Sequence, residues 1–324
     1  MPSPGTRRRL LTVAALLVAL LAAGVSSAAA AVRAPGSVTT TPAPQAFGVT
    51  MPGLPYDTSG LEGLSSALGR RPGLVMWYAA WSDNQAFPAP AAAQVAARGA
   101  TPVVTWEPWN PADGTDQPAY ALDRIAAGDF TTYETSWARQ IKAYGKPVVL
   151  RFGHEMNGGW YPWSANVNGN TASDYVAAWK QVRGVFTKQK VTNVTWSWSP
   201  NVPYPGSTPM ASLYPGDAYV DQVALDGYNW GTLQGGSWTS FADVFAAGLT
   251  EITAVTSRPL YVGEVGAPED GGDKPAWVTD MFATLRQHPE VRGFTWFDFD
   301  KEADWRVDSS AATLDAFRTG LATY

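Results

Sequence analysis

The sequence predicts an α/β protein that folds as a single (β/α)8 barrel, the TIM-barrel fold. From Gln45 onward, short apolar segments rich in β-branched residues alternate with amphipathic helical segments, and there are eight such apolar segments. Strands that alternate with helices form a parallel sheet, and eight strand–helix units close that sheet into a barrel of ~250 residues. Residues 45–324 are long enough for one such barrel, and no change of composition within them indicates a second domain.

The predicted strands are short, mostly apolar and bounded by glycine, proline or asparagine. They cover residues 46–51, 74–81, 101–106, 147–152, 194–199, 223–228, 260–265 and 292–297. The predicted helices place apolar residues at three- and four-residue spacing. They cover residues 130–144, 172–188, 241–255, 277–287 and 311–321. Ser173 is expected to cap the second of these helices.

The first thirty residues have the pattern of a secretory signal peptide. Three arginines, Arg7 to Arg9, precede an apolar stretch that begins at Leu10, and small residues follow before residue 31. An uncleaved membrane anchor is the alternative, because apolar residues continue to Val32. Residues 31–44 are expected to form a linker, since they are rich in proline, threonine and serine. The chain is therefore predicted to be secreted, extracellular and free of the membrane once the signal is removed.

Composition excludes several classes of function. The chain has no cysteine, so disulfides and thiolate catalysis are excluded and a secreted protein must rely on a large core. Its formal charge is −5, or −8 without the three arginines of residues 1–30, and no basic cluster favours nucleic acid as a partner. With two histidines and no phosphate-binding glycine loop, we expect no metal and no cofactor. A monomer is the default expectation.

Acidic and aromatic residues follow most of the predicted strands. In a (β/α)8 barrel the reacting groups lie where strands end and the next loops begin. Carboxyl groups move protons, and flat rings stack on the C–H faces of a pyranose, so this combination is typical of sugar chemistry. The fifteen tryptophans are more than a core usually needs. The strand ends carry Trp77, Trp81, Trp106, Glu107, Trp109, His154, Glu155, Trp196, Trp198, Asp226, Tyr228, Trp230, Glu264, Trp296, Phe297 and Asp298.

Two glutamates stand out because each closes a predicted strand, Glu155 the fourth and Glu264 the seventh. Paired carboxyl groups hydrolyse glycosides with retention at a spacing of ~5–5.5 Å and with inversion at ~6.5–9.5 Å. The fourth and seventh strands face each other across a barrel, so both glutamates are expected to meet at one opening. Strand alternation places Arg151 on the face of Glu155 and turns His154 away, unless a bulge or loop redirects it.

These motifs give the chain a resemblance to a known family. They are Arg151-x-x-His154-Glu155-Met156-Asn157-Gly158-x-Trp160, Tyr214-Pro215-Gly216-Asp217, Asp226-Gly227-Tyr228-Asn229, Gly263-Glu264 and Trp296. With them, residues 45–324 resemble glycoside hydrolase family 26, whose members are retaining (β/α)8 enzymes, mostly β-mannanases. The family also contains β-1,3-1,4-glucanases and β-1,3-xylanases, so the resemblance does not fix the sugar.

The resemblance implies a role for each motif residue. Glu155 corresponds to the acid/base and Glu264 to the nucleophile. His154 and Tyr228 are then expected to contact these glutamates. Trp160 and Trp296 are expected to be platforms on which sugar rings stack.

Physical chemistry leads to matching requirements for the two glutamates. Glu264 must be ionised to attack the anomeric carbon, and a hydrogen bond from Tyr228 and the cation of Arg151 would lower its pKa. Glu155 must start protonated, which needs a less polar setting and the negative charge of Glu264 nearby. Once the glycosyl-enzyme forms, Glu155 can lose its proton and activate water.

Further substrate-binding candidates are Asn157, Glu107 and Trp81, together with Arg151 and His154. Arg151 could instead be an internal ion-pair partner, and His154 and Tyr228 could be structural. Asp226, Asp298 and Asp300 could bind sugar hydroxyls or satisfy backbone groups at the barrel rim.

The predicted function is a secreted, endo-acting, retaining β-glycanase, foremost an endo-β-1,4-mannanase that hydrolyses mannan-type polysaccharide by double displacement. The alternatives are a β-1,3-1,4-glucanase (lichenase), a β-1,3-xylanase, and a non-catalytic carbohydrate-binding barrel.

Overall fold

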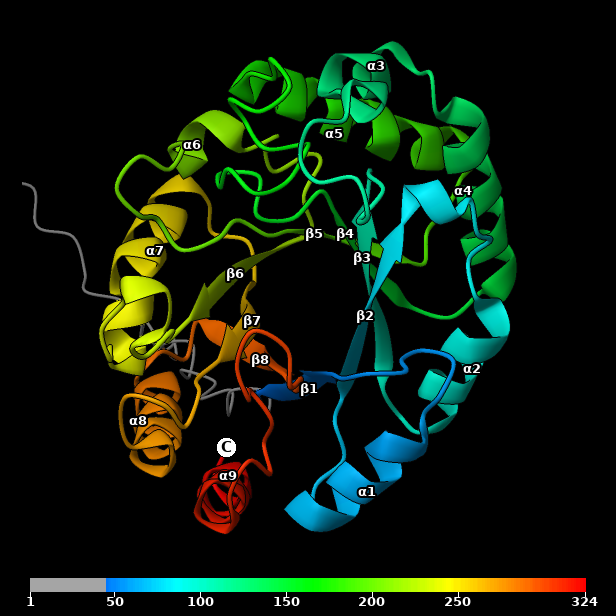
Figure 1. Cartoon of the computed structure of the whole chain (residues 1–324). Helices are drawn as coiled ribbons and strands as arrows, with labels where there is room; N and C mark the ends of the chain where they lie inside the picture. Colours follow the sequence, from blue (N-terminus) through cyan, green and yellow to red (C-terminus); the bar gives the residue numbers. More distant parts are fainter. Residues whose placement is uncertain (1–44) are drawn as a thin grey trace, which may run out of the picture. The chain divides into compact units, whose positions relative to one another are not determined.

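The computed structural model describes residues 45–324, and these residues form a closed barrel of eight parallel strands. Each strand pairs with the next one in the sequence, and the last pairs with the first (Figure 1). The predicted (β/α)8 fold is confirmed, and every predicted strand end lies within one residue of the observed one. The strands are β1 (Ala46–Thr50), β2 (Leu74–Ala80), β3 (Thr101–Glu107), β4 (Val148–Phe152), β5 (Val194–Trp198), β6 (Gln222–Tyr228), β7 (Leu260–Gly266) and β8 (Val291–Phe297).

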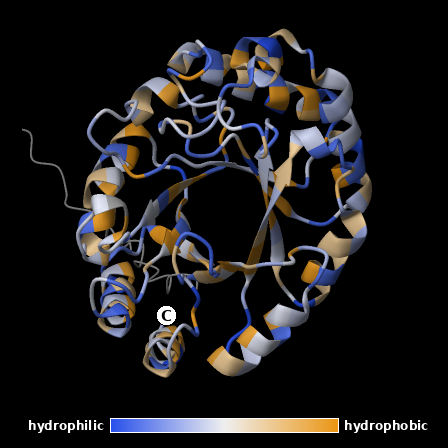
Figure 2. Cartoon of the chain, viewed as in Figure 1, coloured by the Kyte–Doolittle hydropathy of each residue, from blue (hydrophilic) through white to orange (hydrophobic). Residues whose placement is uncertain are grey.

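Helices surround the barrel, and Figure 2 shows that they carry both hydrophobic and hydrophilic residues. This is the pattern of helices with one face packed and the other in water. The α-helices are α1 (Ser59–Leu68), α2 (Ala89–Ala97), α3 (Leu122–Ala127), α4 (Thr131–Tyr144), α5 (Ala172–Lys188), α6 (Met210–Leu213), α7 (Phe241–Val255), α8 (Lys274–Gln287) and α9 (Ala311–Ala322). Short 3-10 helices are η1 (Trp81–Asp83), η2 (Pro118–Tyr120) and η3 (Leu233–Gly235).

Caps set the starts of two of the predicted helices. Helix α5 is capped by Thr171, not by Ser173 as predicted: the Thr171 hydroxyl accepts from the Asp174 N–H, and the Asp174 carboxylate accepts from the Thr171 N–H. This reciprocal pair satisfies two backbone donors that a helix start leaves free. Helix α8 begins three residues before its predicted start, because the Asp273 side chain accepts from the Ala276 N–H.

Alternation along the strands separates two packed layers. Outward residues such as Trp106, Phe152 and Trp296 are buried between the strands and the helices. Inward, Met76, Val103 and Val149 form a small apolar layer within the barrel. Eleven of the fifteen tryptophans are buried. The core thus uses more tryptophans than the sequence analysis expected.

The predicted signal peptide (residues 1–30) and linker (residues 31–44) lie outside the described residues. Within residues 45–324, none of the helices combines the length and the apolar character that crossing a bilayer requires. All of these described residues belong to one compact unit.

Candidate active site

A cavity of about 620 Å³ lies at the carboxyl ends of the strands. Both Glu155 and Glu264 line it, so the two predicted carboxyl groups share one opening. Its volume is within the usual range of ~300–1,000 Å³ for ligand pockets. The lining is mostly aromatic and acidic. It comprises Tyr78, Glu107, Trp109, Pro111, Glu155, Trp160, Tyr161, Asn201, Tyr228, Trp230, Glu264, Phe297, Phe299, Lys301, Glu302 and Trp305.

Glu264 is held by a donor at each of its carboxylate oxygens. Arg151 Nη1 donates to Oε1 at 2.6 Å, and the Tyr228 hydroxyl donates to Oε2 at 2.6 Å. Burial alone would raise the pKa of Glu264, but the Arg151 charge and these hydrogen bonds outweigh it and lower the pKa to about 2. Both expected partners are present, and Glu264 is ionised at neutral pH.

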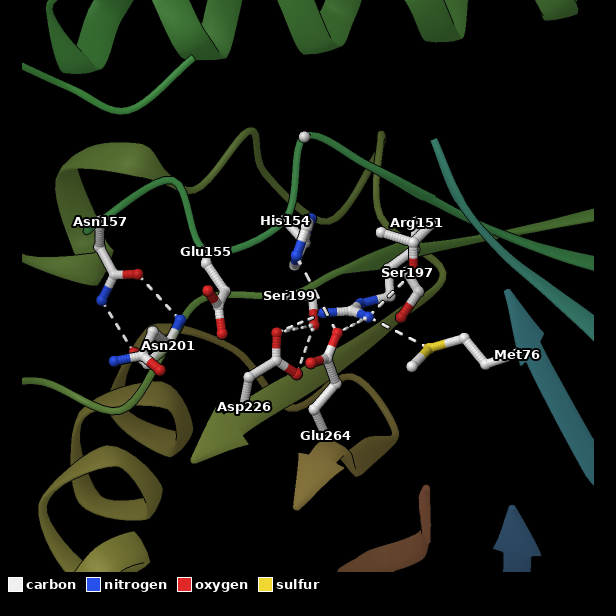
Figure 3. Close-up of polar contacts among 12 residues, drawn as sticks. Met76, Arg151, His154, Glu155, Asn157, Ser197, Ser199, Asn201, Asp226 and Glu264 are labelled. Atoms are coloured by element: carbon white, nitrogen blue, oxygen red, sulfur yellow. Dashed lines mark hydrogen bonds and ion pairs between the residues drawn. The ribbon is translucent and has the colours of Figure 1, made fainter. Parts of the chain in front are cut away.

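Arg151 is the centre of a buried polar network inside the barrel (Figure 3). Besides Glu264, its guanidinium forms an ion pair with Asp226 and donates to Thr105 Oγ1 at 3.0 Å. Asp226 and Glu264 are register partners on β6 and β7, so one cation serves two neighbouring carboxylates. The Ser199 hydroxyl also donates to Asp226. Arg151 and Asp226 do not line the cavity, so they act on substrate only through Glu264.

Glu155 reaches the cavity because the chain leaves the strand geometry after Phe152. Gly153 and Glu155 both have a φ of 51°, in the left-handed region. At residue 153 this conformation favours glycine, and an added Cβ would already contact the Tyr175 ring at 3.4 Å. The Glu155 N–H then donates to the Ser199 carbonyl at 2.7 Å, which fixes the turn. The sequence called for a redirecting loop only if His154 reached the pocket, and His154 does not line the cavity.

The surroundings of Glu155 favour its protonated form. Burial raises its pKa to about 8, and the charge of Glu264 contributes in the same direction. A hydrogen bond from Trp160 Nε1 to Glu155 Oε2, 2.7 Å long, opposes this shift without reversing it. Trp160 is 41 % exposed and lines the cavity. The predicted acid therefore carries its proton at neutral pH.

His154 lies behind the cavity wall, between two carboxyl groups. Its Nε2 is 4.0 Å from Glu264 Oε1, and its Nδ1 is 3.9 Å from Glu107 Oε1. The ring packs on Tyr161, with centroids 4.7 Å apart. Burial, followed by the charge of Arg151, lowers the pKa of His154 to about 3, so the imidazole is neutral. The expected proximity to Glu264 is confirmed, but His154 is 1 % exposed and is not in the cavity lining.

Glu107 closes β3 and, like Glu302, is a further carboxyl group in the cavity wall. Burial raises its pKa to about 8. A protonated carboxyl group there can donate to and accept from a sugar hydroxyl. No group of three or more potential metal-ligating side chains occurs in the described part of the chain.

Besides Arg151 and His154, three other predicted substrate contacts do not line the cavity. Trp296 is fully buried on the outer face of β8, where it packs on Phe317 of α9 with centroids 4.6 Å apart. Trp81 belongs to η1 and packs on Trp106 and Phe152 outside the barrel. Asn157 is 1 % exposed and bonds to the backbone of Asn201, so it does not face the cavity.

Sequence reasoning also missed several cavity residues. Tyr78 lies two residues after Met76, which contacts Arg151 inside the barrel, so strand alternation could have identified it. Phe297 was named with the end of the eighth strand, but Trp296 was chosen as the platform although Phe297 is the one that lines the cavity. Tyr161 and Trp305 come from loops, where no periodicity predicts the direction of a side chain.

With this geometry in place, comparison with known proteins decides the family. Residues 86–265 match the family model described as Glycosyl hydrolase family 26. The chain belongs to this family. The resemblance seen in the sequence is thereby confirmed.

Individual relatives differ in their names and in the share of the chain they match. Endoglucanase H of Acetivibrio thermocellus is 34 % identical over 269 residues, which is 81 % of this chain and 29 % of that protein. "Mannan endo-1,4-beta-mannosidase A and B" of Caldalkalibacillus mannanilyticus is 38 % identical over 184 residues, 55 % of this chain and 32 % of that protein. The chain thus spans about a third of the length of these relatives.

A solved family member shows the same fold. The GH26 β-mannanase of Bacteroides ovatus superposes with a TM-score of 0.66 over 86 % of this chain and 89 % of that chain. Its sequence identity is 17 %, so the likeness concerns the fold alone.

Proposed function

We propose that this glycoside hydrolase is a secreted, endo-acting, retaining β-glycanase whose preferred substrate is a β-1,4-mannan. One observation carries the proposal: two carboxyl groups line one cavity and their pKa values are shifted in opposite directions. Carboxyl groups whose surroundings separate their pKa values in this way take different roles, one as acid and one as nucleophile.

In the first step the Glu264 carboxylate attacks the anomeric carbon, and Glu155 gives its proton to the departing glycosidic oxygen. The bond from the anomeric carbon to that oxygen breaks as the ester to Glu264 forms. Arg151 and Tyr228 each hold one oxygen of Glu264, which limits rotation of the carboxylate.

In the second step water attacks the ester. The ester carries no charge, so the repulsion that helped raise the pKa of Glu155 is removed. Glu155 can now accept a proton from water, the ester bond breaks, and the sugar leaves with its original anomeric configuration.

A second candidate function is hydrolysis of a β-glucan, such as mixed-linkage β-1,3-1,4-glucan. Endoglucanase H matches 81 % of the chain, a larger share than the mannosidases match. The mannan assignment rests instead on several relatives named mannan endo-1,4-beta-mannosidase. Both candidates use the same two glutamates.

A substrate panel tests these proposals. The full chain and Glu264→Gln are incubated with galactomannan, glucomannan, lichenan, β-1,3-xylan and carboxymethylcellulose, and the products are sized. We expect internal cleavage of mannan, and a loss of at least ~10³-fold in Glu264→Gln with polysaccharide binding retained. Faster cleavage of lichenan would favour the β-glucan candidate. Saturable binding without new reducing ends would favour a non-catalytic barrel, and unchanged activity of Glu264→Gln would overturn the mechanism.

Secretion rests on the predicted signal peptide. Expression in a host that can export the chain should place the protein in the medium, with an N-terminus near residue 31. A product that keeps residues 1–30 and stays with the membrane fraction would support the uncleaved anchor instead.

A further inference from the structure

Two aromatic rings lie exposed beside the acid end of the cavity. Trp160 and Tyr204 are 41 % and 40 % exposed, and their ring centroids are 5.7 Å apart with the planes tilted by 32°. Of the large hydrophobic side chains in residues 45–324, only Tyr56 is comparably exposed. Neighbouring exposed rings at an active-site mouth leave apolar surface in water, which indicates contact with a ligand.

The hydrogen bond from Trp160 to Glu155 shows on which side of the cleaved bond this ring pair lies. Trp160 Nε1 donates to Glu155, the group that gives its proton to the departing glycosidic oxygen. The sugar attached to that oxygen must therefore lie on the side of Glu155 and Trp160. Trp160 lines the cavity whereas Tyr204 does not, so Tyr204 extends the aromatic surface outward from it.

The two rings come from different loops, and Asn157 joins those loops. Its amide Nδ2 donates to the Asn201 carbonyl at 2.8 Å, and its Oδ1 accepts from the Asn201 N–H at 2.9 Å (Figure 3). Its own carbonyl accepts from the Thr208 N–H at 3.1 Å. One buried residue of the Trp160 loop thus holds both ends of the 201–208 segment, which carries Tyr204.

Local contacts fix each ring further. At residue 158, an added Cβ would lie 2.6 Å from the Trp160 ring, so the ring packs directly over the glycine backbone. In the other loop, Tyr204 N–H donates to Ser207 Oγ and the Ser207 N–H donates to the Tyr204 carbonyl. Rings held in place before binding lose less entropy when a ligand stacks on them.

We propose that Tyr204, together with Trp160, forms the platform that binds the leaving-group part of the polysaccharide, Trp160 under the first sugar beyond the cleaved bond and Tyr204 under the second. Asn157 is the positioning residue of this platform. The inference rests on the proposed function, because it takes Glu155 as the acid. Such a platform makes the enzyme select substrates that extend at least two sugars past the point of cleavage.

Two substrates of the same β-glycan test the role of Tyr204. One is a hexasaccharide; the other is a nitrophenyl β-trisaccharide, whose leaving group fills only the first position. Tyr204→Ala should lower kcat/KM for the hexasaccharide by roughly three- to tenfold and leave the nitrophenyl substrate unchanged, while Tyr204→Phe keeps the wild-type values. Equal losses on both substrates, or no loss on either, would overturn the platform. If the wild type cleaves neither substrate, the proposed function itself fails.

The positioning role of Asn157 has its own test. In Asn157→Ala the ratio of kcat/KM for the hexasaccharide to that for the nitrophenyl substrate should fall, as in Tyr204→Ala. Asn157→Asp keeps the acceptor for the Asn201 N–H and should restore part of that ratio. A merely structural role would lower both values together, so an unchanged ratio would exclude positioning.

Discussion

The two glutamates of this site have the same side chain and the same cavity but opposite surroundings. Glu264 lies on a strand, contacts the buried cation Arg151 and receives a hydrogen bond at each oxygen. Glu155 lies in a loop with left-handed backbone and receives one neutral N–H, from Trp160. Both carboxyl groups are buried, so burial alone cannot separate them. The contact with Arg151 and the hydrogen bonds to both oxygens together keep Glu264 ionised, and Glu155 lacks this combination.

The strongest way to break this contrast is to remove the cation. Arg151→Met leaves Glu264 and Asp226 buried without their positive partner, so the pKa of Glu264 should rise. We expect kcat/KM at neutral pH to fall by ~10²-fold or more, and the free energy of unfolding to fall by ~3–5 kcal/mol. Kinetics across pH and denaturant titration measure these effects.

Arg151→Lys is the matched control, because it keeps a charge but not the guanidinium that reaches two carboxylates. Its losses should be smaller than those of Arg151→Met. An acid limb of the pH profile that stays in place in Arg151→Met would contradict the role of the cation.

The pH profile of the wild type tests the difference between the pKa values of the two glutamates. The reaction needs Glu264 ionised, with a pKa lowered to about 2, and Glu155 protonated, with a pKa raised to about 8. Activity should therefore persist from mildly acidic to neutral pH, and fall about tenfold per pH unit above about 8, where Glu155 loses its proton.

Glu107 has a similarly raised pKa and must be separated from Glu155. Glu107→Gln should leave the alkaline limb in place, whereas Glu155→Gln should remove it, as judged with a nitrophenyl substrate that needs little acid assistance. If the alkaline limb disappears in Glu107→Gln, it reports the titration of Glu107 and not that of Glu155.

The smallest expected effect concerns the hydrogen bond that opposes the rise in the pKa of Glu155. The Trp160 N–H stabilises the ionised carboxylate, so Trp160→Phe should raise the pKa of Glu155 further. The alkaline limb should move to higher pH by up to about one unit. Trp109→Phe, which removes another indole N–H from the cavity lining, is the control and should leave the limb unchanged. Movement to lower pH in Trp160→Phe would contradict this account.

Prediction from the sequence succeeded for all eight strands and for five of the helices, missed α1, α2, α3 and α6, and assigned some side chains to the wrong face of a strand. Strand ends were predicted to within one residue because apolar runs and the glycines and prolines that bound them are local signals. Trp296 was taken as a sugar platform although its neighbour Phe297 faces the cavity. A shift of one residue along a strand moves a side chain to the opposite face, and a motif does not specify the face.

Loop residues were harder to predict because loops have no periodicity. Asn157 was expected to contact substrate, yet its side chain binds the backbone of a segment more than forty residues away. Tyr204, Tyr161 and Trp305 were not identified at all. Their positions depend on how separate loops pack against one another, which no single stretch of sequence encodes.

Local sequence patterns were enough to predict the order of the strands, the position of Glu155 just after the fourth strand and of Glu264 near the end of the seventh, and the family to which the motifs belong. The protonation states of Glu155 and Glu264, in contrast, depend on contacts that form only in the folded barrel. Arg151 and Glu264 are 113 residues apart in the chain and 2.6 Å apart in the barrel. Electrostatic interaction depends on distance in space and on exclusion of water, and both exist only once the barrel has closed.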